Sequence, residues 1–160
     1  MRSIAIEDDE NEDVLEDDEN ILCLTPFNFE TVSKDTSKDV FVCVYNSNNH
    51  NEQISKVIHA VQKIAKRYKI NYPTPNLVIS CFDRGTFDIP EVTSEQQEKI
   101  EKLTKGEPYI VYFPMNNKKG IRYNFERDYE AFKMFLEQKS EAVKSNMKKW
   151  NWKLKYYIDF

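Results

Sequence analysis

The sequence predicts an α/β domain, and three stretches carry that prediction. Residues 40–45 are six consecutive apolar or β-favouring residues, a run typical of a strand buried on both faces of a sheet. A polar turn follows, and apolar residues then recur every three or four positions from Ile54 to Tyr68, which indicates an amphipathic helix. Residues 77–82 form a second, mostly apolar run. A buried strand that leads through a turn into a helix is half of a βαβ unit, so parallel strands are expected.

Weaker patterns predict the remaining elements. Residues 21–24 read as a short strand, and Thr25 could cap a helix that runs to about Asp35. Two prolines at 73 and 75 end the long helix. A polar surface helix, capped by Thr93 or Ser94, reaches Leu103. Further along we expect a strand over 109–113, a hairpin turn over 115–120, an edge strand over 121–123, and a helix from 127–128 with Phe132, Phe135 and Leu136 on its inner face.

Charge divides the chain more sharply than the net value of −4 suggests. Ten of the 27 acidic residues lie between Glu7 and Glu19, with no basic residue among them. Self-repulsion should keep residues 1–20 extended and solvated, either as a solubilising tail or as an arm that docks on a basic partner. The rest of the chain is mildly basic but has no basic stripe interleaved with aromatic residues, so nucleic-acid binding is not expected.

The three cysteines, Cys23, Cys43 and Cys81, each fall within a predicted strand. An odd number without close spacing argues against a disulfide framework and against a zinc site, so we expect buried free thiols and no cofactor. The sequence has no apolar run long enough for a transmembrane segment, and no signal peptide or ER-retention signal is visible. The expectation is therefore an intracellular protein, in the cytoplasm or in an organelle such as the mitochondrion.

Residues 40–53 resemble the active-site region of the thioredoxin fold, in particular the catalytic-type domains of protein disulfide isomerase. Those domains carry the pattern V-x-V-x-F-Y-A-P-W-C-G-H-C-K. Tyr45 keeps its place in this pattern, Ser47 stands where the proline was, and Asn48 replaces the tryptophan. The two redox cysteines fall on Asn49 and Glu52. The resemblance thus lacks the residues that perform thiol exchange.

Three more motifs of the family follow in the right order, and together the resemblance covers about residues 21–140. They are L-T-x-x-N-F at residues 24–29, D-x-x-x-x-D-[IV]-P at residues 83–90, and G-[YF]-P at residues 106–108, where Pro108 matches and Glu107 departs from the pattern. The resemblance implies a three-layer α/β/α thioredoxin-like domain with a central mixed sheet and a cis Glu107–Pro108 bond. Arg127 matches an arginine that tunes the second cysteine in the isomerases. Because that cysteine is missing, we expect Arg127 to form a surface salt bridge or a cap beside Asp128.

The resemblance predicts a redox-inactive protein that acts as a structural or interaction subunit of a larger assembly. The former active-site turn comprises Asn48, Asn49, His50, Asn51, Glu52, Glu107 and Pro108. A first alternative is a non-catalytic chaperone that binds client proteins around Asn48, His50, Pro108 and Tyr109. A second is acid–base chemistry by His50, Glu52 and Glu107. Two histidines with no third ligand in view do not make a metal site.

Residues 141–160 extend beyond the domain, and the end of this segment alternates with period two. The apolar positions are Trp150, Trp152, Leu154, Tyr156, Ile158 and Phe160. Such alternation predicts a strand with one buried face. The strand could fold back on its own domain, add to a partner's sheet or groove, or contact a membrane interface through its aromatic and lysine side chains. The predicted organisation is an acidic arm over 1–20, a domain over 21–140, and a docking extension over 141–160.

Overall fold

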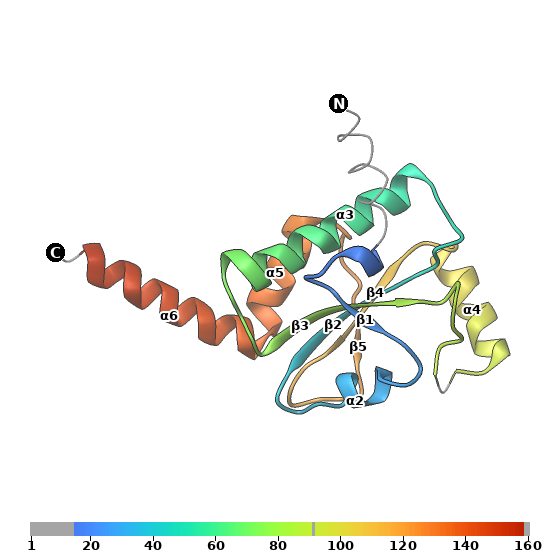
Figure 1. Cartoon of the computed structure of the whole chain (residues 1–160), viewed down its shortest axis with the longest axis horizontal. Coiled ribbons are helices and arrows are strands. Elements are labelled where there is room, and N and C mark those ends of the chain that lie inside the picture. Colours follow the sequence, from blue (N-terminus) through green and yellow to red (C-terminus); the bar gives the residue numbers. More distant parts are fainter. Residues whose placement is uncertain (1–14, 91, 159–160) are drawn as a thin grey trace.

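A five-stranded mixed sheet with helices on both faces forms the centre of the molecule (Figure 1). This computed structural model describes residues 15–90 and 92–158. The strands are β1 (Leu22–Leu24), β2 (Asp39–Tyr45), β3 (Leu77–Asp83), β4 (Tyr109–Phe113) and β5 (Ile121–Arg122). Their order is β1-β3-β2-β4-β5; β3 runs parallel to β1 and β2, whereas β4 is antiparallel to β2 and β5. The predicted α/β domain with a central mixed sheet is confirmed.

Strand β2 lies in the middle of the sheet, and all seven of its residues are buried. It pairs with β3 from Asp39 opposite Leu77 to Tyr45 opposite Asp83, and with β4 on its other side. Because helices cover both faces of the sheet at β2, the side chains on both faces are apolar. This explains the unbroken run of residues 40–45 in the sequence.

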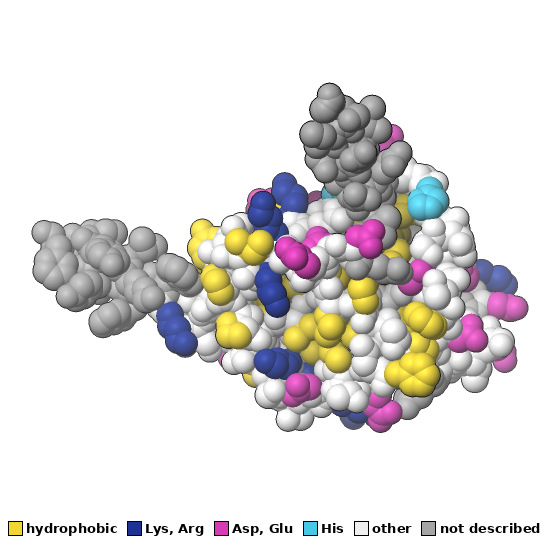
Figure 2. Space-filling view, viewed as in Figure 1, with side chains coloured by type: hydrophobic (Ala, Val, Ile, Leu, Met, Phe, Trp, Pro, Cys, Tyr) yellow, Lys and Arg dark blue, Asp and Glu magenta, His cyan; other side chains and the backbone are white. Residues whose placement is uncertain are grey.

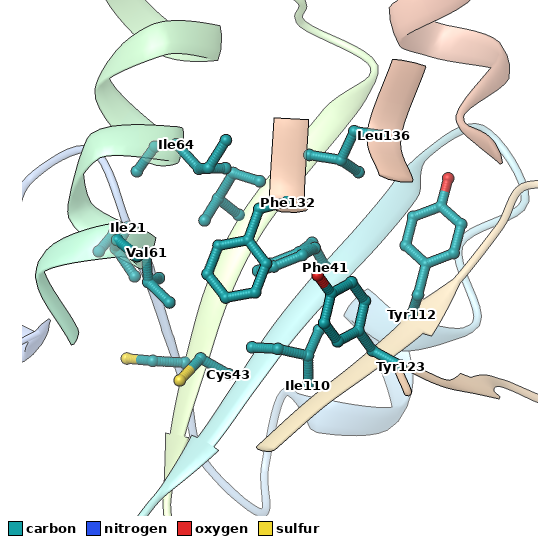
Figure 3. Close-up of a cluster of buried hydrophobic side chains, with 14 of the residues drawn as sticks. Ile21, Phe41, Cys43, Val61, Ile64, Ile110, Tyr112, Tyr123, Phe132 and Leu136 are labelled. Carbon is teal, nitrogen blue, oxygen red and sulfur yellow. The ribbon is translucent and has the colours of Figure 1, made fainter. Parts of the chain in front are cut away.

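Helices α3 (Glu52–Lys66) and α5 (Tyr129–Lys139) cover one face of the sheet. Each begins at a residue whose side chain accepts a hydrogen bond from the first turn: Asn51 from the Ile54 N–H at 2.8 Å, and Asp128 from the Ala131 N–H at 2.9 Å. Figure 3 shows the core that results, in which side chains of both helices meet those of the strands. Its members include Phe41, Val61, Ile64, Ile110, Tyr112, Tyr123, Phe132 and Leu136.

The other face is covered more thinly, by α2 (Phe29–Ser33) and α4 (Ser94–Thr104). Thr93 and Gln96 form the expected capping box of α4, and none of the residues of this helix is buried. Helix α2 starts later than predicted, because the Asn28 side chain accepts the Thr25 N–H at 2.6 Å and donates to the Cys23 carbonyl at 3.3 Å. These bonds form a turn over 25–28, so the prediction of Thr25 as the N-cap is wrong.

The expected acidic arm is partly folded. A short 3₁₀ helix, η1 (Leu15–Asp17), precedes β1, and Leu15 is fully buried in the larger core cluster. The prediction that residues 1–20 stay extended and solvated is therefore wrong for this segment, because one leucine supplies enough apolar surface to pack. Residues 1–14 lie outside the described residues.

The C-terminal extension is a helix, α6 (Glu141–Ile158), so the predicted strand over 150–160 is wrong as far as Ile158. Positions four apart share one side of both a strand and a helix, and for this reason Trp150, Leu154 and Ile158 fit either pattern. The helix also has a ready start, since Ser140 Oγ accepts the Val143 N–H at 3.1 Å. Extending a started helix is easier than nucleating a new element. Residues 159–160 lie outside the described residues.

A buried carboxylate fixes the beginning of α6 to the sheet. Asp39, fully buried at the start of β2, accepts hydrogen bonds from Ser140 Oγ at 2.8 Å and from the Ala142 N–H at 3.0 Å through Oδ2. Its Oδ1 accepts the Met115 N–H at 2.7 Å. Three segments far apart in the sequence are thus joined at one side chain.

Candidate functional site

The former active-site turn joins the end of β2 to the start of α3, and asparagine side chains and backbone groups close it. The Asn49 N–H donates to the Asn46 carbonyl at 3.0 Å, and the Asn48 N–H donates to Asn46 Oδ1 at 2.9 Å. Asn51 then caps α3. Asparagine is suited to such turns because its short side chain can replace backbone partners. These amides therefore hold the turn in shape.

Asp83, at the end of β3, supports the same turn from below. Its Oδ1 accepts the N–H groups of Ser47 at 3.0 Å and Gly85 at 2.9 Å, and its Oδ2 accepts the Thr86 hydroxyl at 2.8 Å. Burial by itself raises the pKa of Asp83, but the hydrogen bonds from Ser47, Thr86 and Gly85 outweigh it and leave the pKa below its ordinary value. The carboxylate that the sequence marked as a family landmark is thus a structural support.

Gly85 lets this loop approach the turn closely. A Cβ atom at this position would lie 2.4 Å from Asn46 Oδ1 and 3.1 Å from Asn48 Nδ2. Any larger residue would push the two segments apart.

The loop before β4 faces the turn, and its conformation differs from the expectation. The described residues contain no cis peptide bond, so Glu107–Pro108 is trans and the prediction of a cis bond is wrong. The loop instead turns through Lys105 and Gly106, whose φ angles are +56° and +74°. Arg127 holds the two following residues in place, with Nη2 2.7 Å from Glu107 Oε2 and Nη1 donating to the Pro108 carbonyl at 2.6 Å. Trans is also the ordinary form of a peptide bond before proline.

The structure brings the turn and this loop together at one point. Asn49 Nδ2 donates to the Gly106 carbonyl at 3.1 Å. Arg127 pairs with Glu107, so the expectation of a salt bridge beside Asp128 is wrong; Asp128 is occupied as the cap of α5. A hydrogen bond and a salt bridge within the chain therefore lie in the region that corresponds, by the resemblance, to the active site of the isomerases.

The two carboxylates of the proposed acid–base group each lie near a basic side chain. Glu107 is paired with Arg127, and Glu52, which is exposed, has Lys56 Nζ at 3.9 Å as its neighbour. His50 lies on the exposed part of the turn. A catalytic acid and base have to be within hydrogen-bond reach of a common substrate. Of the two carboxylates, Glu107 has the close ion pair, whereas Glu52 has a long, solvent-exposed one.

Large hydrophobic side chains are not gathered at the turn. Among the described residues, the exposed ones of this kind belong to other segments: Leu22, Phe27, Ile70, Tyr72, Leu103, Ile121, Phe125, Met134 and Met147. Asn48, His50, Asn51 and Glu52 are exposed and polar, whereas Pro108 is buried and Tyr109 half-buried. A client-binding surface centred on the turn would need more apolar area than this.

The cysteines lie in the sheet rather than at the turn. Cys81 of β3 pairs in register with Cys23 of β1 on one side and with Cys43 of β2 on the other, so the three residues form a row across neighbouring strands. None of the three forms a disulfide, and Cys43 and Cys81 are buried. Burial raises the pKa of Cys43 to about 12, an effect that Arg127 only partly offsets. A thiol of this kind is almost entirely protonated at neutral pH and is a poor nucleophile.

Sequence reasoning missed a buried arginine beside the turn. Arg84 directly follows β3; its side chain is only 6% exposed, and its Nη1 lies 2.7 Å from Glu101 Oε1 on α4. The guanidinium carbons of Arg84 and Arg122 each lie 5.7 Å from the centre of the Tyr109 ring. A single arginine after a strand gives no sequence signal for such a contact. The salt bridge between Arg84 and Glu101 attaches α4, none of whose residues is buried, to the end of the sheet.

The described residues contain neither a metal-binding cluster nor a membrane-spanning helix. Among the described residues, no group of three or more His, Cys, Asp or Glu side chains is arranged to hold a metal ion. In the same part of the chain, no helix has both the length and the apolar character needed to cross a bilayer.

The predicted partner-binding residues fall on or beyond α6. Trp150, Trp152, Leu154, Tyr156 and Ile158 are in the helix, where residues two apart no longer share a side. Their side chains, and all of Phe160, lie outside the described residues. A strand would have placed these residues on one face, whereas in the helix their positions fall on two sides.

Comparison with solved structures identifies the fold. The J-Trx1 fragment of ERdj5 superposes with a TM-score of 0.53 at 16% sequence identity, over 77% of this chain and 53% of that fragment. Human ERp44, in its crystal form II, gives a TM-score of 0.51 at 14% identity, over 74% of this chain and 29% of ERp44. The chain thus spans about half of the first structure and less of the second. No family model and no curated protein sequence gives a significant match. The chain has a thioredoxin-like fold, similar to that of these ERdj5 and ERp44 structures.

Proposed function

We propose that this chain is a redox-inactive thioredoxin-like module that works through protein–protein contacts as a structural subunit of a larger assembly. One observation carries the proposal: the turn that holds two cysteines in the isomerases holds Asn49 and Glu52 here, and the chain's own thiols lie within the sheet. Neither side chain at the turn can form the mixed disulfide on which exchange depends.

The contacts around the turn support the same proposal. Asn49 is bonded to Gly106, and Glu107 is paired with Arg127, so side chains on both sides of the former active site serve the fold. Helix α6 begins at the buried Asp39 network and extends away from the domain (Figure 1). A rigidly anchored projecting helix is suited to contact another protein.

A disulfide-reduction assay tests the loss of redox function. The purified chain is incubated with insulin and dithiothreitol beside thioredoxin at the same concentration, and the turbidity of the reduced insulin chains is followed. We expect no increase over dithiothreitol alone, because no thiolate is available at the turn. A variant with Cys23, Cys43 and Cys81 all replaced by serine should behave identically. Turnover comparable to that of thioredoxin, and its loss in the serine variant, would contradict the proposal.

A further inference from the structure

The first turn of helix α6 packs on the domain. Ala142 and Val143 are buried, whereas Met147, Lys148 and Lys149 are exposed. Beyond this root the helix extends away from the body of the molecule (Figure 1). A helix without tertiary contacts gains little stability in water, since most helical stability comes from packing an amphipathic face. A partner that packs on the extending part of α6 would therefore add to its stability.

The charge of α6 beyond its first residue is entirely positive. Five lysines and no acidic residue occur between 142 and 158. Their positions are Lys144, Lys148, Lys149, Lys153 and Lys155. Charge complementarity requires an acidic partner, and an acidic surface also raises the rate of encounter.

Apolar positions occur on two sides of α6. Met147, Trp150 and Leu154 follow one another by three and four residues, which places these positions along one side of the helix. Trp152 is two residues from Trp150, or roughly 200° around an axis with 3.6 residues per turn. Tyr156, four residues after Trp152, shares that second side. A partner that covers both sides has to enclose the helix.

The same combination of apolar and basic groups continues onto the domain at the root of α6. Asn146 Nδ2 donates to Thr74 Oγ1 at 3.1 Å, which places the turn after α3 against the helix. Lys69 and Ile70, in the π-helix η2 (Arg67–Asn71) that follows α3, are exposed, as is Tyr72 directly after it. Figure 2 shows hydrophobic side chains beside lysine and arginine side chains in this region. The docking surface thus includes the root as well as the projecting part.

We infer that α6 binds an acidic protein of the calcium-sensor class, whose apolar groove opens on calcium binding and closes around a basic amphipathic helix. An anionic bilayer would also attract the lysines, but an interfacial helix buries one side only, and Trp152 and Tyr156 occupy the other. The inference rests on the proposed function, because it names the class of partner that the non-catalytic domain would hold.

Tryptophan fluorescence gives a direct test, because the only two tryptophans of the chain lie in α6. The full chain and its two single-tryptophan variants, Trp150→Phe and Trp152→Phe, are titrated with calmodulin in calcium and then in EGTA. The spectrum of calmodulin alone is subtracted. We expect the emission of both variants to move to shorter wavelength, to saturate at one calmodulin per chain, and to revert in EGTA.

Charge-reversal variants make the test specific. Lys148→Glu combined with Lys149→Glu should weaken binding by about tenfold or more, since the acidic groove then faces like charges. Lys99→Glu combined with Lys102→Glu alters the net charge equally on α4, which lies elsewhere on the domain, and should leave the affinity unchanged.

Two outcomes would overturn the inference. One is the absence of any calcium-dependent change in either single-tryptophan variant. The other is a shift with vesicles of phosphatidylcholine and phosphatidylserine that occurs in Trp152→Phe but not in Trp150→Phe, which would indicate a membrane on one side of α6. Failure here, with no reductase activity, removes the partner class and leaves the proposed function standing. Reductase activity would remove the proposed function whatever α6 binds.

Discussion

The two ends of strand β2 use polar side chains in opposite ways. At its start, Asp39 is fully buried and accepts three hydrogen bonds from segments 76 to 103 residues away in the chain. At its end, the side chains of half-buried Asn46 and exposed Asn51 accept hydrogen bonds from N–H groups two and three residues further along the chain. A buried hydrogen-bond donor that loses its acceptor cannot bond to water instead, whereas an exposed donor can. We therefore expect the buried end to constrain the fold more than the exposed end does.

The largest effect is expected at the buried end. Asp39→Ala leaves the N–H groups of Met115 and Ala142 without an acceptor and should lower the free energy of unfolding by about 3 kcal/mol. Urea unfolding followed by circular dichroism measures the loss. Asp128→Ala removes the exposed cap of α5 and should cost only about 1 kcal/mol. Equal losses in the two variants would mean that the Asp39 network carries no special stability.

A smaller effect is expected from Asp83, which links the sheet to the turn. Its pKa is lowered in the folded state, so its stabilising contribution is complete above the unfolded-state pKa of about 3.9 and disappears as the pH falls through the lower folded value. Unfolding free energies measured from pH 6 downwards should therefore fall less steeply in Asp83→Asn than in the unaltered chain.

Asp35 provides the matched control for this pH dependence. A hydrogen bond from Ser37 lowers its pKa as well, but Asp35 is a surface residue whose interaction is local. Asp35→Asn should change the slope less than Asp83→Asn does. The reverse order would show that the support beneath the turn contributes little to folding.

The smallest effect is expected within the turn itself. Asn51→Ala removes the side chain that caps α3 and should lower the free energy of unfolding by about 1 kcal/mol. Asn48→Ala, at an exposed position with a single long side-chain contact of 3.5 Å to Gly85, should stay within about 0.5 kcal/mol of the unaltered chain. If thermal unfolding shows the same large loss for both, the exposed end is as constrained as the buried one.

Much of the fold could be predicted because its signals are local. The unbroken apolar run of β2 follows from its burial on both faces of the sheet. The apolar positions of α3, three or four residues apart, follow from burial of one side of the helix. The cap at Thr93 depends on Gln96 three residues later, which a sequence displays openly. The prediction for the end of the chain was wrong because Trp150, Leu154 and Ile158 fit both the strand and the helix periodicity. The choice between the two depends on where α6 starts.

The site was less predictable because its contacts are long-range. The partner of Arg127 is 20 residues distant and that of Arg84 is 17 residues distant, so neither follows from spacing. The motif at Gly106–Pro108 placed the loop correctly, yet the bond geometry there depends on Arg127 and on the positive φ angles of Lys105 and Gly106. A motif marks where a loop lies, whereas its conformation depends on neighbours that the motif does not contain.

The row of cysteines has a practical consequence for studying this domain. Cys43 and Cys81 sit opposite each other on the two central parallel strands, where reagents reach them only when the sheet opens. Their rate of alkylation in the native state therefore reports the free energy of that opening, in the same way that amide hydrogen exchange reports local unfolding. The two buried thiols thus serve as internal probes of the opening of the sheet.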